Sequence, residues 1–143
     1  MRGHSHQQSH LIGIGIDIIE TERIRLALNR RGRVFLERVF SPEELRQLPD
    51  GAMLVPRVAA RFAAKEAVLK ALGCGLSGVS WREVEILGQT PRAPKVRLSG
   101  KAASLAESMG VREVLVSMSH SREYAVAQVV ALGSAREKDV REG

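Results

Sequence analysis

Two short stretches of the chain contain charged side chains whose spacing could support metal and phosphate chemistry. In LIGIGIDIIE, residues 11–20, isoleucine occupies every even position from 12 to 18, and the intervening positions hold two glycines and Asp17. In RVAARFAAKEAVLKAL, residues 57–72, Glu66 stands among lysines. A strand and a helix that each supply one carboxylate could share a hard cation. Mg²⁺ takes one or two protein carboxylates and completes its shell with water and substrate phosphate.

The helix predicted for residues 57–72 places its charged residues close to its apolar stripe. Phe62 and Leu69 define that stripe. With an advance of about 100° per residue, Lys65 falls about 60° to one side of Phe62 and Glu66 about 40° to the other. Lys70 lies one turn beyond Glu66. These are unusual positions for charges that only solvate a helix surface.

A structural role is a second explanation of the same residues. Glu66 and Lys70 form an i,i+4 pair of the favourable orientation, worth about 0.2–0.5 kcal/mol on an exposed helix. Taken singly, this explanation is the more frequent one, and Asp17 alone could equally cap the end of its strand. The metal hypothesis depends on the combination, since a half-buried carboxylate needs a partner. Glycines at positions 13 and 15 would also let a ligand or a helix approach the strand closely.

The elements that must position these residues can be read from periodicity, caps and turn residues. Ser41, Pro42 and Glu44 predict a capping box at the start of a short helix, and Gly73 closes the lysine-containing helix. Helices and antiparallel strand pairs in succession predict an α+β fold, a single compact domain with a mainly antiparallel sheet packed against helices. The expected strands are 11–19, 81–88, 94–100 and two within 113–132 joined at 120–123; the expected helices are 20–40, one from 41, 57–72 and 100–110, with a loop at 48–56.

Length and composition indicate one soluble domain with an anionic partner. Hydrophobic residues make up 44% of the 143 residues and aromatic residues only 3%, so the core must be aliphatic and rich in alanine. No stretch approaches the roughly 20 apolar residues of a membrane helix, and a lone cysteine, Cys74, suits the reducing cytoplasm. We expect residues 1–10, with three histidines, to be a disordered leader or tag, residues 11–132 to form the domain, and residues 133–143 to be a charged tail. A net charge of +6, from 17 arginines and 5 lysines against 16 acids, favours nucleic acid, a phosphorylated cofactor or an acidic protein.

The two motifs together resemble holo-acyl-carrier-protein synthase, the small bacterial type of 4′-phosphopantetheinyl transferase. The family's first motif, G-x-D with an arginine after five further residues, stands here as Gly15, Asp17 and Arg23. Its second motif, F-A-x-K-E-A-x-x-K-A, stands complete at residues 62–71. The segments GCG, KVRLSG and VSMSHS also look like the family, and the similarity covers residues 11–132.

The resemblance implies transfer of the 4′-phosphopantetheine arm of coenzyme A to a serine of apo acyl carrier protein, in fatty acid biosynthesis. The by-product is adenosine 3′,5′-bisphosphate. By the same resemblance, Asp17 and Glu66 are Mg²⁺ ligands, and either Glu66 or a metal-bound water is the general base. The resemblance also implies a homotrimer with its active sites between subunits. The residues expected to be catalytic or to hold coenzyme A are Glu66, Lys70, Lys65, Arg61, Gly73 and His120.

Arginines in the segment 20–40 are the expected docking residues for the acidic carrier protein. Arg23 and Arg30 are seven residues apart and therefore lie on nearly one face of a helix. Arg31 and Arg38 form a second pair with the same spacing. Some of these arginines will be ordinary solubilising residues.

Two other functions compete with this interpretation. A small Mg²⁺-dependent nuclease could use the same carboxylate pair, although nucleases usually bring more acidic ligands. A non-catalytic nucleic-acid-binding module would suit the pI near 10.2. That module is disfavoured because five aromatic residues leave little for base stacking, and because the basic residues are spread along the chain. We therefore expect no nucleic-acid partner and no membrane partner.

Overall fold

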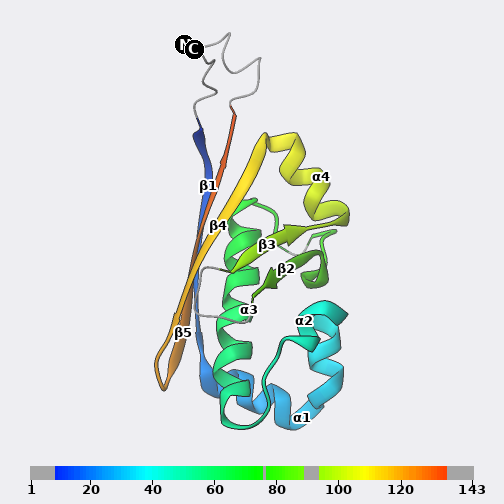
Figure 1. Cartoon of the computed structure of the whole chain (residues 1–143), viewed down its shortest axis with the longest axis vertical. Coiled ribbons are helices and arrows are strands. Elements are labelled where there is room, and N and C mark those ends of the chain that lie inside the picture. The colour runs from blue at the N-terminus through cyan, green and yellow to red at the C-terminus, as the bar shows by residue number, and fades with distance from the viewer. Residues whose placement is uncertain (1–8, 76, 89–93, 135–143) are drawn as a thin grey trace.

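A three-stranded antiparallel sheet with one long helix packed along it organises the chain (Figure 1). The computed structural model describes residues 9–75, 77–88 and 94–134. In chain order the elements are β1 (His10–Glu20), α1 (Thr21–Val39), α2 (Pro42–Arg46), the 3₁₀ turn η1 (Gly51–Met53), α3 (Leu54–Ala71), the 3₁₀ turn η2 (Trp81–Glu83), β2 (Val84–Leu87), β3 (Lys95–Leu98), α4 (Gly100–Met109), β4 (Val111–His120) and β5 (Tyr124–Gly133).

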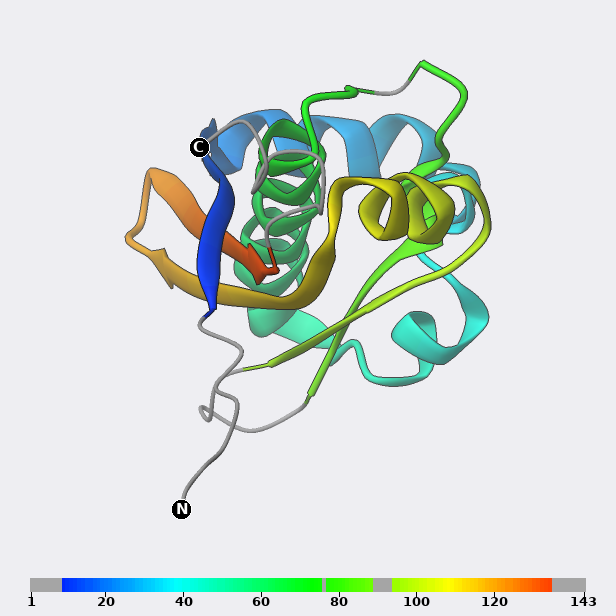
Figure 2. The same cartoon turned by 90° about the horizontal axis from the view of Figure 1, so that it is seen from above.

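The strands form two antiparallel sheets, and the smaller one lies on the same side of the larger sheet as the helices. The larger sheet has the order β1-β5-β4, and β2 pairs with β3. Figures 1 and 2 show α3 packed on one face of the larger sheet, with β2, β3 and the other helices beyond it. The expected α+β class with an antiparallel sheet is confirmed. No helix in the described part of the chain is long and apolar enough to cross a bilayer.

Glycines in β1 allow α3 to lie directly on the strand. A Cβ at Gly15 would stand 1.9 Å from the carbonyl oxygen of Ala67, and one at Gly13 would stand 2.2 Å from that of Ala71. Both distances are far inside van der Waals contact, so only glycine fits. Side chains alternate across a strand, so Asp17 lies on this same helix-facing side. The close approach that the glycines predicted is made by a helix.

The core is aliphatic and rich in alanine, as the composition indicated. Alanine supplies six of the buried positions on α3, where a small side chain permits close contact with the sheet: Ala59, Ala60, Ala63, Ala64, Ala67 and Ala71. Across the interface, β5 contributes alternate buried residues: Ala125, Ala127, Val129 and Ala131. Because the side chains on both surfaces are small, the backbone of α3 lies close to the sheet. This close contact sets how far the charged residues of the helix lie from β1.

The opposite face of the three-stranded sheet is left open. Ile14, Ile16 and Ile18 are 60–64% exposed. Their partners on the neighbouring strand β5 are Val130, Gln128 and Val126, respectively. In Figure 1 no element covers this side of the sheet. A single chain therefore presents a largely apolar sheet face.

Three expected elements have different boundaries in the structure. Helix α3 begins at Leu54 rather than residue 57, because Pro56 fits the first turn of a helix, where no backbone donor is needed. The stretch 81–83 forms a 3₁₀ turn, so β2 begins only at Val84. The helix α1 is interrupted at Gly32, which has φ 43° and ψ −110°. The leader and tail expected at the two ends fall mostly outside the described residues, although His10 and Gly133 are already in strands.

Candidate active site

Asp17 and Lys70 meet where β1 lies against α3. The Lys70 ammonium donates hydrogen bonds to the Asp17 carboxylate, with Nζ–Oδ1 at 3.0 Å, and to the carbonyl oxygen of Ile16 at 2.9 Å. The Asp17 side chain is 18% exposed, whereas that of Lys70 is 55% exposed. The structure therefore brings together the predicted metal ligand and the predicted phosphate-binding lysine, with the lysine facing solvent.

Glu66 stands one turn before Lys70 on the same helix and has a partner that the sequence analysis missed. Its Oε2 accepts a hydrogen bond from the indole Nε1 of Trp81 at 2.6 Å. Trp81 belongs to η2, 15 residues further along the chain. No local pattern pairs these two residues, because the contact depends on how η2 returns to α3.

Asp17 and Glu66, the predicted ligands, offer the oxygen donors that magnesium prefers. In residues 9–75, 77–88 and 94–134, no three or more histidine, cysteine, aspartate or glutamate side chains gather as a metal cluster would require. Asp17 Oδ2 and Glu66 Oε1 accept no hydrogen bond from the described residues. Two carboxylates, each with a free oxygen, suit a hard cation that draws its other ligands from water and substrate phosphate. They suit Zn²⁺ poorly, since its sites use more nitrogen or sulfur ligands.

Lys65, which the sequence predicts to bind coenzyme A, does not lie with these residues in the structure. Its side chain has no exposed surface, and Nζ donates to Glu44 Oε1 at 2.7 Å, to the Trp81 carbonyl oxygen at 3.0 Å and to the Val84 carbonyl oxygen. Burial lowers the pKa of Lys65, and the Glu44 carboxylate opposes that shift. With three acceptors around three N–H donors, the ammonium has no donor left for a phosphate.

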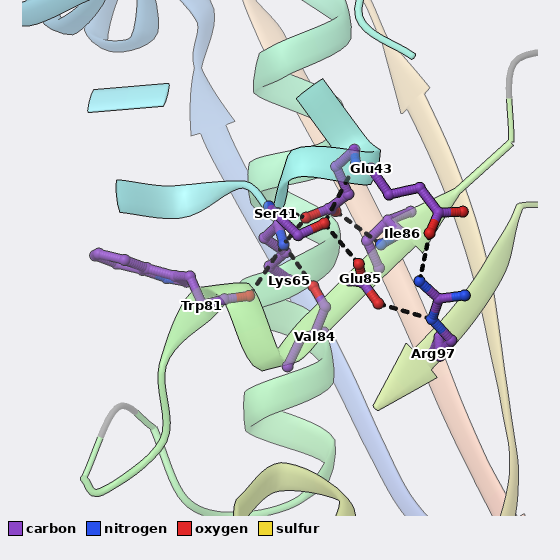
Figure 3. Close-up of polar contacts among 9 residues, drawn as sticks. Ser41, Glu43, Lys65, Trp81, Val84, Glu85, Ile86 and Arg97 are labelled. Carbon is purple, nitrogen blue, oxygen red and sulfur yellow. Dashed lines mark hydrogen bonds and ion pairs between the residues drawn. The ribbon is translucent and has the colours of Figure 1, made fainter. Parts of the chain in front are cut away.

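The buried ammonium belongs to a polar network that joins four elements (Figure 3). Glu44 also accepts from the backbone N–H groups of Ser41 and Ile86, and the capping box predicted at Ser41 is present. Glu85 accepts from the Ser41 hydroxyl at 2.6 Å and from Arg97 Nε at 2.7 Å. The network ties α2, α3, β2 and β3 together, on the side of α3 away from the three-stranded sheet.

Two other residues expected near the cofactor lie apart, Arg61 within α3 and Gly73 just beyond its end. Arg61 is 4% exposed, one turn before Lys65, and Nη2 donates to the carbonyl oxygen of Gly88. Burial, followed by the charge of Arg57, lowers the pKa of Arg61. Gly73 is exposed just beyond the end of α3 with φ 71°, and its N–H donates to the carbonyl oxygen of Lys70 at 3.0 Å. Gly73 thus adjoins the Lys70 end of the site, whereas Arg61 faces the β2 side.

His120 is separated from the carboxylates within one chain. Register places Asp17 opposite Ala127 of β5, and Ala127 opposite Met118 of β4. Strands lie about 4.8 Å apart, so β4 runs roughly 10 Å from β1. His120 instead lines a cleft of about 780 Å³ at the end of the β4–β5 hairpin, where Arg25 and Arg122 supply positive charge.

The arginines of α1 are exposed, but only one expected pair keeps its geometry. Arg23 and Arg30 precede Gly32 and form no ion pair with any described residue, which leaves them available to a partner. Arg31 and Arg38 lie on opposite sides of the Gly32 interruption. A seven-residue spacing places two residues on one face only when the helix is continuous, so their predicted common face is not formed.

Comparison with known proteins identifies the family of this chain. The model of the 4′-phosphopantetheinyl transferase superfamily matches residues 13–129. The holo-[acyl-carrier-protein] synthase of Thermoanaerobacter sp. (strain X514) is 39% identical over 123 residues, which are 86% of this chain and 88% of that protein. The crystal structure of the Neisseria meningitidis holo-[acyl-carrier-protein] synthase superposes with a TM-score of 0.76 at 37% identity, covering 85% of this chain and 98% of the other. The Helicobacter pylori holo-[acyl-carrier-protein] synthase in complex with coenzyme A gives a TM-score of 0.72 at 33% identity, with coverage of 82% and 98%. The chain therefore belongs to the 4′-phosphopantetheinyl transferase superfamily and is a relative of the holo-[acyl-carrier-protein] synthases.

Proposed function

We propose that this protein is a Mg²⁺-dependent holo-[acyl-carrier-protein] synthase. It moves 4′-phosphopantetheine from coenzyme A to a serine of apo acyl carrier protein and releases adenosine 3′,5′-bisphosphate, in the cytoplasm and in the service of fatty acid biosynthesis. The observation that carries the proposal is the meeting of Asp17 with Lys70 at the β1–α3 junction, one helical turn from Glu66. These residues belong to the two family motifs, and relatives with the same fold bind coenzyme A.

The chain supplies oxygen ligands and one accessible cation for this reaction. Asp17 and Glu66 would hold the metal, which supplies charge neutralisation to the diphosphate and to the leaving group. The serine oxygen forms a new bond to phosphorus while the bond to the bisphosphate oxygen breaks, and the serine proton must leave. Lys70 faces solvent at the same junction, where its ammonium can hold a phosphate oxygen. Glu66 or a water at the site would accept the proton, and water is the base we favour, because Trp81 occupies Oε2 and the metal would take Oε1.

We further propose that three copies assemble through the open sheet face and share their active sites. Exposed apolar patches of this kind mark interaction surfaces, and Ile14, Ile16 and Ile18 supply the apolar side chains on β1. The separation of His120 from Asp17 within one chain also favours a shared site, because a neighbouring copy could supply the arginine-lined cleft. The acidic carrier protein would dock on α1 through Arg23 and Arg30.

The decisive experiment is intact-mass spectrometry of apo acyl carrier protein incubated with this protein, coenzyme A and Mg²⁺. We expect a mass gain of one phosphopantetheinyl group that disappears when EDTA removes the metal. Asp17→Asn and Glu66→Gln should nearly abolish the gain, whereas Glu107→Gln, an exposed acid on α4, should leave it unchanged. Absence of any gain with folded wild-type protein and several carrier proteins would overturn the proposal.

A further inference from the structure

Glu66 is held in place by one donor in the described structure. Trp81 Nε1 binds Oε2 at 2.6 Å, and the other oxygen, Oε1, accepts nothing from the described residues. A hydrogen bond to one oxygen fixes the rotation of a carboxylate and presents its second oxygen in one direction. Partners of this kind orient metal ligands, and their loss typically costs about 10–100-fold in metal affinity or activity.

Trp81 is itself anchored at both ends. Its carbonyl oxygen accepts from the buried Lys65 ammonium at 3.0 Å, and its ring lies against Phe62 with centroids 5.6 Å apart. The 3₁₀ turn that carries it is capped by Ser80, whose hydroxyl accepts from the Arg82 N–H at 3.2 Å. Figure 3 shows the Trp81 carbonyl directed at Lys65 and the ring extending away from it.

These contacts bind one residue to three positions on the same turn of α3. On the helix, Phe62 lies between Lys65 and Glu66, about 60° from one and about 40° from the other. Trp81 follows that order: its backbone binds Lys65, its ring covers Phe62 and its indole N–H reaches Glu66. The indole cannot swing away from Glu66 without giving up its packing on Phe62, and the bond from Lys65 to the Trp81 carbonyl holds the backbone from which the indole extends.

We propose that Trp81 is a positioning residue that orients Glu66 for metal binding, with buried Lys65 as its anchor. This inference rests on the proposed transferase function, because it takes Glu66 to be a metal ligand. It also assigns a role to the first lysine of the K-E pair: Lys65 acts through the Trp81 backbone and does not touch the substrate.

The variant Trp81→Phe separates the hydrogen bond from the packing. Phenylalanine retains an aromatic ring against Phe62 and the backbone carbonyl for Lys65, but it has no N–H donor. Binding of Mn²⁺, measured by loss of the free-ion electron paramagnetic resonance signal, should weaken at least about tenfold. The matched control is Phe35→Leu, which alters the far end of the same aromatic cluster, 6.3 Å from Phe62. It should leave Mn²⁺ affinity unchanged, even where both variants lower the melting temperature.

A second measurement needs no change at Trp81. The chain has a single tryptophan, so its fluorescence reports on the indole beside Glu66 alone. Addition of Mg²⁺, which does not quench fluorescence, should shift the emission of the wild type, because a dication on Oε1 changes the electric field at the ring. Asp17→Asn should lose the shift, since it removes the other ligand and leaves the Trp81–Glu66 bond intact.

The outcomes separate this inference from the proposed function. Equal Mn²⁺ affinity in Trp81→Phe and the wild type, in a chain that transfers phosphopantetheine, overturns the positioning role and leaves the transferase assignment standing. Equal weakening in Trp81→Phe and Phe35→Leu also overturns it, because packing alone would then explain the effect. A wild-type chain that neither binds Mn²⁺ nor transfers the group overturns both.

Discussion

At the scale of single residues, two lysines of one motif have opposite environments. Lys65 is fully buried against Glu44, whereas Lys70 is largely exposed beside Asp17. Lys65→Met should lower the free energy of unfolding by about 3–5 kcal/mol, because Glu44 is left as an unpaired buried charge. Lys70→Met should cost less than about 1 kcal/mol, since the lost ion pair is exposed, yet it should reduce turnover. Urea denaturation of both variants tests this contrast, and equal losses would contradict it.

The exposed arginines of α1 are expected to set the affinity for an acidic carrier protein. Arg23→Glu should raise the KM for an acidic carrier roughly tenfold at low salt, with less effect on kcat, because charge complementarity acts mainly on encounter. The effect should shrink as ionic strength rises. Lys101→Glu makes the same charge change on α4, at the opposite end of the molecule in Figure 1, and should leave the KM unchanged. A KM that responds alike to both changes would indicate a general effect of net charge.

At the scale of elements, the β1–α3 contact fixes the site. Gly15→Ala would place a methyl group 1.9 Å from the Ala67 carbonyl oxygen, which belongs to backbone and cannot rotate away. We expect a loss of at least about 1–3 kcal/mol, typical of overpacking, together with lost transfer activity, because α3 must move away from Asp17. Thermal unfolding and the mass assay measure the two effects. Ser104→Ala, at an exposed position on α4, is the control and should change neither.

The junction of α2, β2 and β3 predicts a pH dependence of stability. The hydrogen bond from Arg97 is the main cause that lowers the pKa of Glu85 from its usual 4.5, with a further contribution from Ser41. The folded chain therefore holds the carboxylate ionised at a pH where the unfolded chain has taken up a proton. Stability contributed by Glu85 is present above pH 4.5 and is lost as pH falls below it toward the lowered folded pKa. Glu85→Gln should flatten this part of the stability–pH curve relative to the wild type, and parallel curves would contradict the assignment.

At the scale of the whole molecule, the open sheet face predicts assembly. Ile16→Lys places a charge in the middle of that face. Light scattering after gel filtration should then report monomers for the variant, whereas we expect trimers for the wild type. Circular dichroism should be unchanged, since Ile16 is 60% exposed in one chain. Val34→Lys, at an equally exposed apolar residue on α1, is the control and should remain trimeric. A monomeric wild type with full activity would contradict both the trimer and the shared site.

Much of the fold could be predicted because its signals are local. The alternation in β1 and the capping box at Ser41 each reflect neighbours in the chain, and the structure contains both. The glycines of β1 predicted a close approach, but its partner, α3, lies more than fifty residues further along the chain. The sequence analysis placed the start of α3 three residues too late, and it did not predict the interruption of α1 at Gly32. Pro56 is compatible with both a loop and a first helical turn, and a glycine inside a helical pattern does not by itself report a positive φ.

The sequence by itself determined which residues are candidates for the chemistry, because motif spacing on a strand and a helix dictates which side chains share a face. It grouped Asp17 and Glu66 with both Lys65 and Lys70. Only the tertiary structure separated Lys65 from Lys70, since burial depends on α2 and β2 packing over one side of α3. The partnership of Trp81 with Glu66, the distance of His120 from Asp17 and the open apolar face of the sheet were likewise decided there. Each depends on contacts between residues far apart in the chain, and no local pattern encodes them.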